Sequence, residues 1–82
     1  MSDIKAEFDG EIDLINKEEK TIRIDSSGGK CITRIPVEIF DKISIGNKVV
    51  LKGYLEKVVN GHHLVKNYKI KISNDESVVY SS

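Results

Sequence analysis

Residues 46–72 read GNKVVLKGYLEKVVNGHHLVKNYKIKI, which is two runs of alternating apolar residues joined by Asn60 and Gly61. An Asn-Gly pair between two such runs is the strongest short-range signal of a β-hairpin. Both central residues of its type I′ turn need positive φ, which Asn tolerates and Gly adopts freely. A two-residue turn places Val59 opposite His62, and this fixes the pairing of the whole hairpin.

The same register predicts which side chains face each other further from the turn. Val49 is expected opposite Ile72, so that both lie on the apolar face. Gly53 is expected opposite Tyr68, whose ring would cover the exposed glycine backbone. The turn and the apolar pattern agree, so we take this hairpin as the anchor of the fold.

The N-terminal segment predicts a long strand. Residues 3–14 alternate completely between apolar and charged side chains, with Leu14 expected inward and Asp13 outward. Gly10 within this strand indicates a bulge or a sharp coil, which a small barrel needs in order to close. Asp13 is expected opposite Arg23 of the next strand, as a favourable cross-strand pair.

Shorter elements fill the region between this strand and the hairpin. We expect strands at residues 21–25 and 30–35, and a short helix at residues 36–44 that begins with Pro36. The most consistent phase of the third strand places Cys31, Thr33 and Ile35 inward and Ile32 and Arg34 outward. The apolar stripe of the helix is expected to be Val37, Phe40 and Ile43.

Composition predicts one small domain at residues 1–73 and a polar, flexible tail at residues 74–82. The single cysteine, the lack of a signal-peptide pattern and the lack of a long apolar run favour a cytoplasmic protein with no membrane partner.

Residues 1–19 carry seven acids and two lysines, a net charge of −5, whereas residues 20–71 carry eleven bases and four acids, a net charge of +7. This segregation suggests an anionic partner, or simply neighbouring strands that neutralise each other.

The order of elements resembles the oligonucleotide/oligosaccharide-binding (OB) fold. The closest match is Thr33-Arg34-Ile35-Pro36, then Phe40, then the Ile45–Gly53 stretch IGNKVVLKG. The resemblance implies an all-β, five-stranded Greek-key barrel with one short helix between strands three and four. A small SH3-like barrel is the main competitor, and the helix argues against it.

In OB-fold proteins, ligands usually lie across the outer face of strands two and three, flanked by the first and last loops. Both arginines of this chain fall on the corresponding surface, where a guanidinium suits phosphate and base contacts. Tyr54 is the one ring expected to point outward from the barrel, although it lies off that track. The candidate nucleic-acid-binding residues are Lys20, Arg23, Lys30, Ile32, Arg34, Tyr54, His62 and His63.

No pattern in the chain indicates an enzyme, a metal site or a cofactor. His62 and His63 are adjacent on a strand and therefore point to opposite faces, so they are poorly placed to chelate one metal ion. Cys31 is expected in the core, where it would not act as a nucleophile. Gly28-Gly29-Lys30 lacks the earlier glycine and the following helix of a phosphate-binding loop.

Two functions remain from the sequence. The first is binding of single-stranded nucleic acid, with DNA and RNA both open. The second is a protein-interaction module that docks through the distal hairpin, where Val58, Val59 and Val65 are expected to form an apolar patch. The resemblance gives nucleic acid a slight preference.

Overall fold

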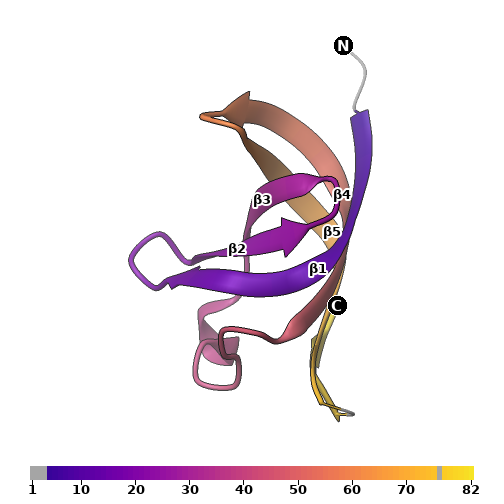
Figure 1. The fold of residues 1–82 in the computed structure, drawn as a ribbon. Coiled ribbons are helices and arrows are strands. Elements are labelled where there is room, and N and C mark those ends of the chain that lie inside the picture. The colour runs from indigo at the N-terminus through magenta and orange to yellow at the C-terminus, as the bar shows by residue number, and fades with distance from the viewer. Residues whose placement is uncertain (1–3, 76) are drawn as a thin grey trace.

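The alternating stretches form strands throughout the computed structural model, which describes residues 4–75 and 77–82 (Figure 1). The strands are β1 (Ile4–Asn16), β2 (Thr21–Ser26), β3 (Gly29–Arg34), β4 (Lys48–Val59), β5 (His62–Asn74) and β6 (Ser77–Ser81). The sheet order is β3-β2-β1-β4-β5-β6, and an additional parallel pairing of β3 with β5 closes the first five strands into a barrel. The predicted all-β class and five-stranded barrel are confirmed.

The turn of the anchoring hairpin has the predicted conformation. Asn60 and Gly61 have φ values of 52° and 79°, as a type I′ turn requires. Val59 lies opposite His62, and the base of the hairpin keeps the predicted register of residues 48–52 with 69–73. The orange end of the hairpin projects beyond the barrel in Figure 1.

A one-residue bulge at Tyr68 changes the register in the middle of the hairpin. Gly53 lies opposite Asn67, so the prediction that Tyr68 covers Gly53 is wrong. The glycine is needed for another reason, because a Cβ atom there would lie 2.4 Å from the backbone oxygen of Lys66. The two strands approach closely at this point, and Tyr68 is turned outward with 52% of its surface exposed.

A second bulge, on β4 at Glu56, restores the original register toward the tip. Between the two bulges Leu55 lies opposite Val65, and beyond Glu56 the strand resumes with Lys57 opposite Leu64. Val65 therefore faces the interior and is 3% exposed. The prediction that it belongs to an outward apolar patch is wrong, because the bulges reverse its face.

The curvature of β1 lets one strand serve both sides of the barrel. Gly10 pairs with β4 on one edge and with β2 on the other, as its predicted role in closing the barrel requires. The bulge itself lies at Asp13, so Leu14 pairs with Arg23 and is 45% exposed. The inward placement of Leu14 is wrong, and Ile15 packs against the core in its place.

The core fills the barrel interior and extends under the segment between β3 and β4. The predicted inward phase of β3 is confirmed, with Cys31, Thr33 and Ile35 buried. The Thr33 hydroxyl donates a hydrogen bond of 2.9 Å to the backbone oxygen of Val65, which ties β3 to β5 inside the barrel. The largest fully buried side chains are Ile12, Ile22, Ile24, Leu51, Ile70 and Ile72.

The helix between β3 and β4 is confirmed as a single 3-10 turn, η1 (Val37–Ile39), which is shorter than the predicted range 36–44. Ile39 and Phe40 are buried against the barrel, whereas Val37 is 56% exposed and does not join the apolar stripe. A 3-10 turn has three residues per turn, so it directs a different set of side chains inward than an α-helix would. Within residues 4–75 and 77–82, no helix is long and apolar enough to cross a membrane.

The residues after 73, expected to form a flexible tail, include a further strand. β6 pairs antiparallel with the end of β5 and places Tyr80 opposite Ile72. Val79 and Tyr80 pack against the core cluster. The apolar run at residues 78–80 therefore adds a sixth strand beside the barrel (Figure 1).

Candidate functional site

A groove of about 490 Å³ opens on the outer surface at the end of the pairing between β3 and β5. The pairing ends at Thr33 and Val65, and Asn67 then bridges the two strands. The Asn67 side-chain amide donates hydrogen bonds of 2.7 Å to the Thr33 hydroxyl and to the backbone oxygen of Arg34. The groove is lined by Thr21, Ile32, Thr33, Arg34, Glu56, Leu64, Val65, Lys66 and Asn67.

The groove combines an apolar floor with cationic rims. Ile32 of β3 lies beside Leu64 of β5, and both are only partly buried. Arg34 and Lys66 are exposed, and within residues 4–75 and 77–82 neither forms an ion pair. Glu56, placed there by its bulge, is the acidic side chain of the lining. Such a site suits a ligand that presents a flat or apolar group to the floor and anionic groups to the rims.

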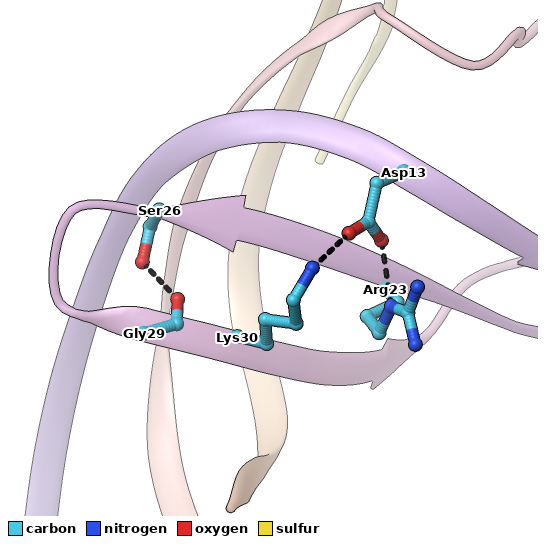
Figure 2. Close-up of polar contacts among 5 residues, drawn as sticks. All are labelled: Asp13, Arg23, Ser26, Gly29 and Lys30. Atoms are coloured by element: carbon cyan, nitrogen blue, oxygen red, sulfur yellow. Dashed lines mark hydrogen bonds and ion pairs between the residues drawn. The ribbon is translucent and has the colours of Figure 1, made fainter.

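Beside the groove, a carboxylate holds two of the predicted cationic contacts together (Figure 2). Asp13 accepts a hydrogen bond of 2.7 Å from the Arg23 Nε and one of 2.5 Å from the Lys30 Nζ. Partial burial acts to raise the pKa of Asp13, but the hydrogen bonds from Arg23 and Lys30 outweigh it and lower the pKa below its usual value. An anionic ligand would therefore compete with Asp13 for these two side chains.

The β2–β3 turn presents Lys30 to this ion-pair network. The Ser26 hydroxyl donates a hydrogen bond of 2.6 Å to the backbone oxygen of Gly29 (Figure 2). Gly29 has a φ of 117°, which a side-chain-bearing residue rarely adopts. The turn is therefore tightly specified, and the lysine that follows it points toward Asp13.

We expect Asp13→Asn to lower the free energy of unfolding by about 0.5–1 kcal/mol at pH 7, because partly exposed ion pairs contribute about this much. The folded pKa of Asp13 lies below its unfolded value of about 3.9, so the stabilisation is present above that value and is lost as pH falls through the folded pKa. The difference between wild type and variant should shrink below about pH 4.

Urea unfolding at a series of pH values measures this difference. Asp9→Asn is the matched control, since Asp9 is exposed on the same strand and forms no ion pair in the described part of the chain. Equal unfolding midpoints for wild type and Asp13→Asn at pH 7 would show that the network adds no stability.

The two histidines occupy different surroundings. The His63 ring packs on Phe8, with the ring centroids 5.5 Å apart, and its Nδ1 lies 3.2 Å from the backbone oxygen of Lys30. His62 lies beside Lys30 in the β3–β5 pairing and opposite Val59 at the hairpin turn. His63 is thus held within the barrel wall. His62 is the histidine nearer to the outer face of β2 and β3, where the ligand was expected.

Lys20 lies in the turn before β2 and has a φ of 61°. Its backbone oxygen accepts a hydrogen bond of 3.1 Å from the amide of Ile35, which fixes the turn against the end of β3. Its side chain is exposed, at the same end of β2 as Thr21 of the groove.

Tyr54 is partly buried and does not line the groove, but its cross-strand neighbour Lys66 does. It is opposite Lys66 on β5 and opposite Lys5 on β1. Its ring contacts that of Tyr68, with centroids 5.2 Å apart.

Ile32 and Arg34 were expected at the site and line the groove, whereas the predicted β5 residues His62 and His63 do not. The β5 residues that line the groove are Leu64, Val65, Lys66 and Asn67, and none of them was expected there. A closed five-stranded barrel requires two strands that are not sequence neighbours to meet, and the pairing of β3 with β5 would have indicated Leu64 and Lys66.

Other reactive groups are placed as core or surface residues. Burial raises the pKa of the Cys31 thiol to about 12, so it stays protonated at neutral pH. Among residues 4–75 and 77–82, no group of three or more His, Cys, Asp and Glu side chains is arranged to hold a metal ion.

Comparison of the chain with protein-family models, with curated proteins and with solved structures gave no match. Any functional assignment therefore rests on the residues and their geometry.

Proposed function

We propose that this chain is a non-catalytic OB-fold protein that binds single-stranded nucleic acid. The observation that carries the proposal is the β3–β5 groove, in which an apolar floor of Ile32 and Leu64 lies between Arg34 and Lys66. The strand order, with β1 shared between two partners and β3 closing on β5, supports the OB assignment. The groove adjoins the outer face of β2 and β3, where OB-fold ligands usually lie.

A single strand fits this surface better than a duplex does. An unpaired base offers a flat apolar face to Ile32 and Leu64, while its flanking phosphates reach Arg34 and Lys66. A duplex hides those faces within its base stack and would leave the floor uncovered. The fold does not discriminate DNA from RNA, and both are candidate ligands.

The charge distribution predicts modest, salt-sensitive affinity. Arg23 and Lys30 lie on the same outer surface, but phosphates have to displace Asp13 from them. The chain has no net charge, so long-range attraction is weak and binding relies on the local cations.

Titration of a labelled single-stranded oligonucleotide at several salt concentrations tests the proposal. If about three to four cations contact phosphates, log Kd should change with log salt with a slope of roughly 2–3. Arg34→Ala should reduce the slope by about 0.7 and weaken binding to all sequences alike. Lys42→Ala, at an exposed lysine outside the groove lining, is the control and should change neither value.

Failure of single-stranded DNA and RNA to bind at micromolar protein and low salt would refute the proposal. A slope unchanged by Arg34→Ala would place any binding elsewhere on the molecule.

The second candidate is a protein-interaction module that uses the distal hairpin. Ile4, opposite Leu55 of β4, is 60% exposed, and Val58, opposite His63 of β5, is 54% exposed. Val65 no longer supports this candidate because it is buried, and Val58 and Val59 alternate between the two faces of the hairpin. Light scattering and a pull-down with wild type and Val58→Asp test it, and a monomer that retains no partner would count against it.

A further inference from the structure

Two aromatic rings, the partly buried Tyr54 of β4 and the exposed Tyr68 of β5, lie on the strands that border the groove. Tyr54 and Tyr68 contact each other with centroids 5.2 Å apart and an interplanar angle of 42°, so the rings are tilted and not stacked face to face. Tyr68 is the extra residue of the β5 bulge and is 52% exposed. Bulges are often placed where a strand has to redirect one side chain, and this bulge turns a tyrosine away from the core.

Lysines surround the tyrosine pair on the outer face of β1, β4 and β5. Lys5 and Lys66 are the two cross-strand neighbours of Tyr54. In the next row Lys52 and Lys69 lie directly opposite each other, a like-charge pair that is unfavourable without a counter-ion.

Glu7 meets only part of this need for a counter-ion. It lies 3.6 Å from the Lys52 Nζ and is itself 72% exposed, which makes the ion pair weak. The surface therefore retains a local excess of positive charge around two aromatic faces.

We propose that Tyr54 and Tyr68 form a base-stacking platform that extends the nucleic-acid site beyond the groove. A strand lying over Ile32 and Leu64 passes Lys66, which lines the groove and is also the cross-strand neighbour of Tyr54. Its next bases then stack on the two tyrosine rings. This inference rests on the proposed function. It adds base stacking as a contact, and it extends the path of the bound strand from the β2–β3 face to β4 and β5.

The tyrosines provide their own spectroscopic signal. The chain has three tyrosines and no tryptophan, so in a Tyr80→Phe background all tyrosine fluorescence comes from Tyr54 and Tyr68. We expect an oligothymidylate of about ten nucleotides to quench this fluorescence, whereas an abasic strand of equal length does not.

Replacement by leucine keeps apolar bulk at the site and removes the aromatic face. Tyr68→Leu and Tyr54→Leu should each weaken oligothymidylate binding by roughly 5- to 100-fold and leave abasic-strand binding unchanged. Tyr68→Phe keeps the ring and should bind like its parent. Far-UV circular dichroism confirms that each variant is folded before it is titrated.

The outcomes separate this inference from the proposed function. Oligothymidylate could bind the parent protein without quenching its fluorescence and bind both leucine variants as tightly as the parent. In that case the platform is wrong and the groove alone binds. If the leucine variants lose oligothymidylate and abasic binding equally, the tyrosines only support the structure, which also overturns the platform. If neither strand binds the parent protein, the proposed function and the platform both fail.

Discussion

Replacement of Gly10 by alanine is expected to reduce the free energy of unfolding by about 3 kcal/mol or more, a large part of the roughly 4–12 kcal/mol available to a domain of this size. A Cβ atom at this position would lie 2.2 Å from the backbone oxygen of Asp25 and 2.9 Å from the Cα of Ser26. Both neighbours are backbone atoms, so no change of rotamer relieves the clash. The strands β1 and β2 would have to separate where the barrel turns.

Urea unfolding followed by circular dichroism measures this loss. Gly28→Ala is the matched control, because a Cβ atom at Gly28 has no neighbour within 4 Å. We expect the control to change the free energy of unfolding by less than about 0.5 kcal/mol. A similarly small change for Gly10→Ala would show that β1 and β2 do not approach each other as closely as described.

Reversing the charges of the groove rims is expected to weaken oligonucleotide binding by about 100-fold or more at low salt. In the double variant Arg34→Glu, Lys66→Glu, two attractions to phosphate become two repulsions, and Glu56 adds a third anion beside them. Both side chains are exposed, so the barrel should remain folded.

The control for this experiment carries the same change in net charge at other sites. Lys42→Glu, Lys48→Glu alters two exposed lysines outside the groove lining. We expect it to weaken binding only slightly, through long-range repulsion. Equal losses for the two double variants would mean that binding depends on net charge and not on the groove.

The predictable part of the fold was its strands and the two ends of the hairpin register. Asn60 and Gly61 fixed the turn, and the apolar pairs at the hairpin base fixed the other end. The bulges at Glu56 and Tyr68 were not predictable, because the register shift at one bulge is cancelled by the other. The pairing at both ends of the hairpin is therefore the one expected for a hairpin without bulges.

The bulge in β1 shows the same ambiguity. The run Ile12-Asp13-Leu14-Ile15 permits either Leu14 or Ile15 to point inward after Ile12. The choice depends on how β1 bends from β4 to β2, which is a tertiary constraint. Asp13 was nevertheless expected to meet Arg23, and that contact is present.

The candidate site was only half predictable for a related reason. Ile32 and Arg34 follow from the alternation of β3, which is a local pattern. Leu64 and Lys66 join them through a parallel pairing between segments 32 residues apart, as in Ile32 with Leu64, and no local pattern carries that information. The groove therefore forms only where barrel closure brings the residues of β3 beside those of β5.

Amide chemical-shift mapping with a single-stranded oligonucleotide shows which residues the ligand contacts. We predict that the largest shifts occur around the groove where β3 closes on β5, at Thr21, Ile32, Arg34, Leu64 and Lys66. Shifts confined to residues 37–45 or to the hairpin tip, or no shifts at all, would contradict it.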